Sequence, residues 1–131
     1  MNRVRNQLKS MLRVEPCEGG FSATLKVDPD FVLFPDHFQS NPILPGICLI
    51  QSVLLAGAIR LGVSDLRLCS LKNVKFTAPV LPADLVLIDA QFSDQDDGAV
   101  LIKANLRTAE KRLAQLSLVA RIDASDTEGR I

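Results

Sequence analysis

The chain has 131 residues, of which 47% are hydrophobic, and its fifteen basic side chains balance its fifteen acidic ones. This length fits one domain, residues 1–131, with a real hydrophobic core. The absence of net charge and of a basic stripe argues against a nucleic acid or an anionic membrane as a partner.

Cysteine usage and the N-terminus indicate where the protein works. Cys17, Cys48 and Cys69 are odd in number and lack the spacing of a metal site, so we expect a reducing cytoplasm with no metal and no cofactor. The N-terminal residues MNRVRNQLKSML hold no apolar stretch of signal-peptide length, which predicts that the chain is not exported. Residues 1–9 and 124–131 are expected to be frayed termini.

The first strong pattern is the alternation over residues 21–27, FSATLKV, which predicts a half-buried strand. The next stretch, residues 28–46, contains four prolines and three aspartates, so we expect an ordered but irregular loop with one helical turn at most. Loops of this kind often carry functional residues.

A long apolar helix is predicted from Gly46, with Gly62 as its C-cap. Its only polar side chains before Arg60 are Gln51 and Ser52, so the rest of the chain must wrap around it. The apolar stretch over residues 43–59 is short for a membrane span, and a buried core helix is the better interpretation.

The second half of the chain reads as strands. Residues 66–80 form a long strand that prolines end, and three more strands follow, joined by short turns at 93–98 and 108–112. Alternation assigns one face of each of these three strands to the core: Val86, Ile88, Ala90 and Phe92; Val100, Ile102, Ala104 and Leu106; Leu116, Leu118, Ala120 and Ile122. The predicted fold is α+β, a strongly bent antiparallel sheet around one central helix.

Three motifs resemble the FabZ/FabA type of 3-hydroxyacyl-[acyl-carrier-protein] dehydratase, which has the hotdog fold. They are His37-Phe38, then the sequence NPILPG over residues 41–46, and KFTAPVLPAD over residues 75–84. The order and spacing match over roughly residues 10–123. The resemblance therefore implies a hotdog fold and an acyl-thioester ligand.

In that family a histidine removes the α-proton, and a backbone N–H at the start of the central helix stabilises the enolate-like thioester oxygen. The resemblance assigns these roles to His37 and to Gly46. A near-neutral imidazole suits a general base, and the N–H groups of a helix start favour negative charge. The family's helix carboxylate, supplied by the other subunit, is replaced by Gln51, and an amide cannot donate a proton in acid catalysis.

Further residues follow from the same resemblance. Phe38, Leu44, Pro45, Phe76 and Pro79 are expected to bind the substrate. Two other side chains have simpler roles: Asp36 could orient the imidazole of His37, and Cys48 is read as a structural thiol because the chain has no second histidine.

Three functions remain open from the sequence. The first is a FabZ-like dehydratase of fatty-acid, polyketide or related lipid biosynthesis, of reduced activity because of Gln51. The alternatives are a non-catalytic subunit that binds an acyl carrier or partners an active paralogue, and a hotdog acyl-thioesterase. The expected partners are an acyl carrier protein or a coenzyme A thioester, and a second copy of the chain in a homodimer or a larger assembly of dimers.

Overall fold

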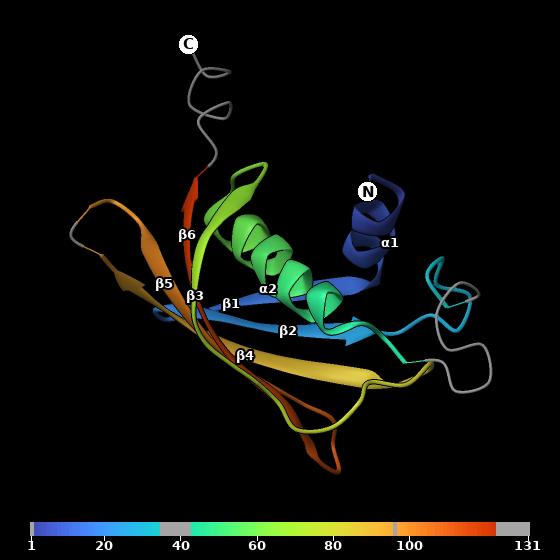
Figure 1. The fold of residues 1–131 in the computed structure, drawn as a ribbon. Helices are drawn as coiled ribbons and strands as arrows, with labels where there is room; N and C mark the ends of the chain where they lie inside the picture. Colours follow the sequence, from blue (N-terminus) through green and yellow to red (C-terminus); the bar gives the residue numbers. More distant parts are fainter. Residues whose placement is uncertain (1, 35–42, 96, 123–131) are drawn as a thin grey trace.

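The computed structural model describes residues 2–34, 43–95 and 97–122, and these form a bent sheet with two helices on its inner side (Figure 1). The strands are ordered β1-β2-β4-β5-β6-β3, and every neighbouring pair is antiparallel. The elements in chain order are α1 (Asn2–Met11), β1 (Leu12–Cys17), β2 (Gly20–Lys26), α2 (Gly46–Leu61), β3 (Leu66–Phe76), β4 (Leu85–Asp94), β5 (Val100–Arg107) and β6 (Arg112–Ile122).

The strands bury the faces that alternation assigns to the core. The inward side chains of β2 and the matching positions of β4 to β6 lie against α2, whereas their neighbours face outward. The expected meander is confirmed, since β4 pairs with β5 and β5 pairs with β6. Ile122 is the exception, because it is 48% exposed at the end of the last strand.

The central helix α2 begins at Gly46 and ends at Leu61, as the sequence predicts. Gly62 adopts a left-handed conformation with φ of 72°, and its N–H donates to the carbonyls of Ala58 and Ile59. At the same end, the Nε of Arg60 donates to Gly20 O at 2.8 Å, which fastens the helix to the start of β2. The helix is thus anchored where it leaves the sheet.

The N-terminal segment differs from the expectation that residues 1–9 fray. Residues 2–9 belong to α1, in which Val4 and Leu8, one turn apart, are buried against the core, and residue 1 lies outside the described residues. Its Gln7 accepts a hydrogen bond from the N–H of Val32 at 2.8 Å, so the helix also supports the segment after β2. Strand β1, which follows α1 and pairs with β2, was not predicted either. Residues 124–131 lie outside the described residues.

Strand β3 is shorter than the predicted strand over residues 66–80. It ends at Phe76, after which the N–H groups of Thr77 and Ala78 both donate to Leu113 O. Pro79 cannot donate to a ladder, which stops regular pairing. Val80 then forms an isolated bridge with Leu44. The chain after β3 is thereby brought to the residues that precede α2.

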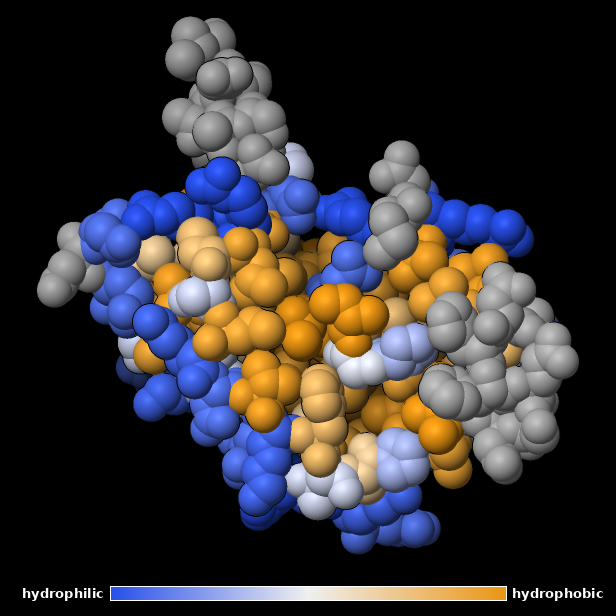
Figure 2. Space-filling model, viewed as in Figure 1, coloured by the Kyte–Doolittle hydropathy of each residue, from blue (hydrophilic) through white to orange (hydrophobic). Residues whose placement is uncertain are grey.

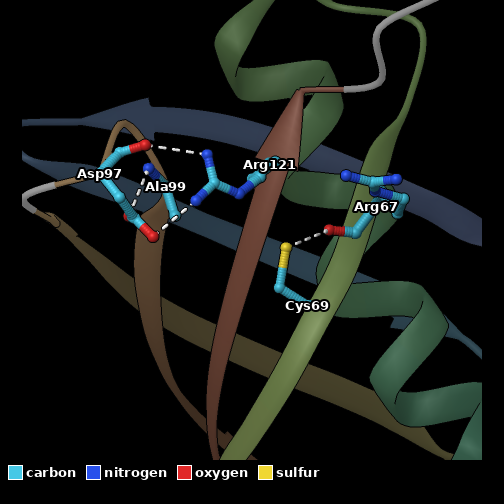
Figure 3. Close-up of polar contacts among 5 residues, drawn as sticks. All are labelled: Arg67, Cys69, Asp97, Ala99 and Arg121. Atoms are coloured by element: carbon cyan, nitrogen blue, oxygen red, sulfur yellow. Dashed lines mark hydrogen bonds and ion pairs between the residues drawn. The ribbon is translucent and has the colours of Figure 1, made fainter.

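Polar contacts at the rim hold the turn after β4. Figure 3 shows Arg121 of β6 reaching Asp97, whose backbone O accepts from Nη1 at 2.8 Å and whose carboxylate accepts from Nη2. The same carboxylate accepts from the N–H of Ala99 at 3.2 Å. This contact joins β6 to the β4–β5 connection.

The described residues contain no helix that is long and apolar enough to cross a membrane. Within the same residues, no three His, Cys, Asp or Glu side chains gather as a metal site would require.

Candidate functional site

The start of α2 is the first part of the candidate site. Pro45 is the N-cap, with φ of −58° and ψ of 143°, and it offers no side-chain hydrogen bond to the first turn. The first turn also carries no acidic residue. The first N–H groups of a helix have no carbonyl partner inside the helix, and they carry its positive dipole end. The N–H of Gly46 is therefore available to an acceptor that approaches the helix start.

An apolar cavity of about 410 Å³ opens beside this helix start. Its walls include four residues of the predicted site, namely Leu44, Gly46, Phe76 and Pro79, together with Ile43, Leu49, Thr77, Ala78 and Val80. Cavities of this size and lining are typical of small-molecule sites. The structure thus brings together the residue predicted to donate to the thioester oxygen and three of the residues predicted to bind the substrate.

The ring of Phe76 covers the start of the helix. A Cβ atom added at Gly46 would lie 2.8 Å from Cζ of Phe76, which is closer than real Cβ atoms approach. Glycine therefore lets the ring rest against the backbone of the first turn, and a larger residue at this position would require the ring to move. Phe76 remains 48% exposed, so one side of the ring faces the outside.

The backbone of Leu44 fixes this arrangement. Its N–H donates to Val80 O at 2.8 Å, and its side chain is buried. The segment that leads into α2 and the segment that follows β3 are therefore held edge to edge, although they are far apart in the sequence. Of the predicted substrate-binding residues, Pro45 acts as the N-cap and is not among the residues that line the cavity.

Gln51, in contrast, does not face this cavity. Five residues along an α-helix correspond to a rotation of about 140°, so Gln51 and Gly46 lie on different sides of α2. Gln51 lines another cavity, of about 210 Å³, with Arg5 and Asp65. One chain alone does not bring the two positions together.

Cys48 sits one turn into the helix and is only 1% exposed. Burial raises the pKa of its thiol to about 11, so the thiol stays protonated near neutral pH. A protonated thiol is a poor nucleophile. The expectation that Cys48 is structural is consistent with this environment.

His37, Phe38 and Asp36 lie outside the described residues, and their roles stay predictions. Two residues near Gln51 were missed from the sequence: Arg5 and Asp65, which form an ion pair at 3.3 Å. The spacing of the buried side chains in α1 could have indicated a helix there, but nothing in the sequence shows that Arg5 reaches Asp65.

Comparison with known proteins identifies the family. The sequence profile of the ApeI-like family, described as ApeI dehydratase, matches residues 14–116. A 3-hydroxyacyl-[acyl-carrier-protein] dehydratase FabZ of a Wolbachia strain from Drosophila simulans is 30% identical over 116 residues, which cover 82% of this chain and 81% of that protein.

Solved structures agree on the fold. The dehydratase heterocomplex ApeI:P from Xenorhabdus doucetiae superposes with a TM-score of 0.66 at 23% identity, covering 83% of this chain and 94% of that one. A hypothetical thioesterase with coenzyme A from Streptococcus pneumoniae superposes with a TM-score of 0.66 at 14% identity, covering 94% of this chain and 96% of that one. These likenesses show the hotdog fold. Since the profile match also spans most of the chain, the protein belongs to the ApeI-like dehydratase family and is FabZ-like in sequence.

Proposed function

We propose that the chain dehydrates 3-hydroxyacyl thioesters carried on a phosphopantetheine arm, either of an acyl carrier protein or of coenzyme A, in fatty-acid or related lipid synthesis. One observation carries this proposal. The uncapped start of α2 at Gly46 opens into an apolar cavity whose other walls come from Leu44, Phe76 and Pro79. Family membership supports the same reaction class.

The chemistry follows from these groups. His37 takes the α-proton of the thioester, and the electrons of the broken C–H bond move toward the carbonyl oxygen. The N–H of Gly46 stabilises the developing charge, an effect that apolar walls strengthen because they lower the local dielectric. The electrons of the enolate then form the double bond between C2 and C3 while the C–O bond at C3 breaks. The leaving hydroxide takes a proton from the imidazolium of His37 by way of a bound water, so that it departs as water and His37 is neutral again. Gln51 holds this hydroxyl, or a water that gives it a proton, by hydrogen bonds.

The second part of the proposal is that the site is completed by another chain. β3 forms the edge of the described sheet and pairs only with β6 there. Hydrophobic side chains are also exposed along β3 and in the first turn of α2: Leu71 and Phe76 are each 48% exposed, and Ile47 is 56% exposed. Figure 2 shows hydrophobic side chains gathered over the middle of the face on which α2 lies. Covering this face with a second copy would shelter the free edge of β3, and the shared site that the family resemblance implies would then combine Gln51 of one copy with His37 of the other.

Interconversion of 3-hydroxyacyl and trans-2-enoyl thioesters tests the activity directly, since the two differ by the mass of one water. We expect slow turnover, because loss of an acid partner lowers the rate by about 10²- to 10⁴-fold. His37→Ala should abolish the turnover, and Gln51→Glu should raise it. Lys103→Ala, on the outer face of β5, is the control that should change nothing.

Failure of every variant to interconvert the thioesters would refute the proposed reaction. Release of free thiol from the same substrates would instead indicate a thioesterase. The mass of the assembly is an independent measurement: a species of 14.3 kDa at micromolar concentration, equal to one chain, would contradict the shared site.

A second candidate is favoured by Gln51 itself. Because an amide cannot supply a proton, the chain could act as the non-catalytic member of a mixed dimer whose other subunit carries the carboxylate. The test is to mix the protein with a homologous dehydratase that has glutamate at this position. Co-elution, with a rate per catalytic subunit above that of the homologue alone, would support it.

A further inference from the structure

A second cavity lies between α1, α2 and the start of β3, on the side of α2 away from Gly46. Its volume is about 210 Å³, and Arg5, Gln51, Leu54, Leu55, Asp65 and Leu66 line it. Arg5 crosses from α1 and places Nη2 3.0 Å from Ser64 O and 3.3 Å from Oδ1 of Asp65. Gln51 is thus the only one of the predicted site residues that shares a cavity with an ion pair within the part of the chain that the structure describes.

The amide of Gln51 has a definite orientation in this cavity. Its Oε1 is fully buried and has no hydrogen-bond partner among the described residues. Nε2 is not among the buried side-chain atoms that lack a partner in the described residues, so the unmet hydrogen-bonding need of this amide lies at its oxygen. A buried acceptor without a donor is costly and rare in folded proteins. The arrangement therefore calls for a donor inside the cavity.

Water held by Arg5 meets this requirement. Each water takes up about 30 Å³ in the liquid and needs two to four polar partners, and the cavity has room for several. A water that accepts from the guanidinium can donate to Oε1 of Gln51 and to the carboxylate of Asp65. Arg5 has five donors on a rigid fork, and its hydrogen bonds to Ser64 and Asp65 both use Nη2.

We propose that Arg5 is a positioning residue for Gln51: through water in this cavity it holds Oε1 inward, so that the two N–H bonds of Nε2 face the shared site. This inference rests on the proposed dehydration, in which Gln51 acts on the oxygen at C3 of the substrate. With Oε1 turned inward, Gln51 acts on the ligand only as a hydrogen-bond donor. The site would accordingly select ligands that carry an oxygen acceptor at C3.

Side-chain NMR tests the orientation without reference to activity. The amide signal of Gln51 is assigned by its loss in Gln51→Leu. Arg5→Met should shift this signal and speed the hydrogen exchange of its protons, whereas Arg3→Met, an exposed change on the same helix, should leave both as they are. Arg5→Lys keeps the charge but loses the fork, and it should shift the signal part of the way even if Arg5→Met folds poorly.

Turnover provides the second readout. Arg5→Met should lower kcat by about 3- to 30-fold with little change in KM, and it should have no further effect in the Gln51→Leu background. An unchanged Gln51 signal in both Arg5 variants, or equal losses of kcat with and without Gln51, would overturn the proposal. A shifted signal with no turnover in any variant would support the positioning by Arg5 and would refute the dehydration instead.

Discussion

Ala83 is the only non-glycine residue with positive φ in the described part of the chain, at 72°. It lies in a turn in which Asp84 N–H donates to Leu81 O at 3.1 Å, with Pro82 at the second position. A type II turn has proline there and a positive φ at the next residue, which glycine favours. Two hydrogen bonds to Val27 keep the turn in this conformation although it is unfavourable for alanine: Ala83 N–H donates to Val27 O at 2.8 Å, and Val27 N–H donates to Asp84 O at 2.9 Å.

Ala83→Gly should therefore stabilise the protein. The left-handed conformation costs an alanine about 1–2 kcal/mol. Glycine removes this cost but gains about 0.5–1 kcal/mol of conformational freedom in the unfolded chain. The methyl group is exposed, so its loss removes little packing. The net gain in unfolding free energy is about 0.5–1 kcal/mol, which corresponds to a rise in Tm of about 2–4 °C.

Equilibrium denaturation at one fixed protein concentration measures this gain, since assembly would otherwise shift the midpoint. Gly62→Ala is the matched control with the opposite sign. Its φ is also 72°, and an added Cβ would meet no atom within 4 Å, so the loss of about 1 kcal/mol would come from the backbone alone. Equal or lower stability of Ala83→Gly, beside a destabilised Gly62→Ala, would show that the turn does not strain the alanine.

Three further predictions concern other parts of the fold. Burial raises the pKa of Cys48 from 9.0 to about 11, so the folded state holds a proton that the unfolded state releases above pH 9; stability should fall as the pH rises from 9 to 11, and Cys48→Ala should reduce this fall in a pH series of denaturation curves. Leu8→Ala should cost about 2–5 kcal/mol in the same unfolding assay, whereas a frayed N-terminus would make it neutral. Arg121→Ala should cost under about 1 kcal/mol, and less in high salt, because its ion pair with Asp97 is partly exposed; a salt-independent loss would contradict this.

The sequence predicts the helix and the sheet well because their signals are local. Alternation identifies the buried faces, and Gly62 marks the end of α2. The N-terminal helix was missed because only Val4, Leu8 and Met11 carry its apolar face, and basic residues surround them. The length of β3 was overestimated because the residues after Phe76 no longer pair regularly with β6. Val80 instead forms a bridge with Leu44, just before α2, which is a contact between distant segments.

The candidate site also has a part that could be predicted from the sequence and a part that could not. The two motifs around Gly46 and Phe76 predict residues that the structure brings into one cavity. These motifs are far apart in the sequence, so their meeting was predicted from the family resemblance and not from a local pattern. The surroundings of Gln51 could not be predicted, because Arg5 and Asp65 reach it only after α1 has packed against α2. Polar contacts between elements that are distant in sequence leave no periodic signal.

Phe76 combines two positions that are usually separate, since it lies at the end of an edge strand and also covers the start of the central helix. Any chain that adds itself to the free edge of β3 must arrive beside this aromatic ring. If the chain assembles through this edge as proposed, assembly and the shape of the cavity are coupled by mass action, and the entrance that a ligand meets would depend on the protein concentration. Under that proposal, a ligand affinity would have to be measured at several protein concentrations before it could be assigned to one assembly state.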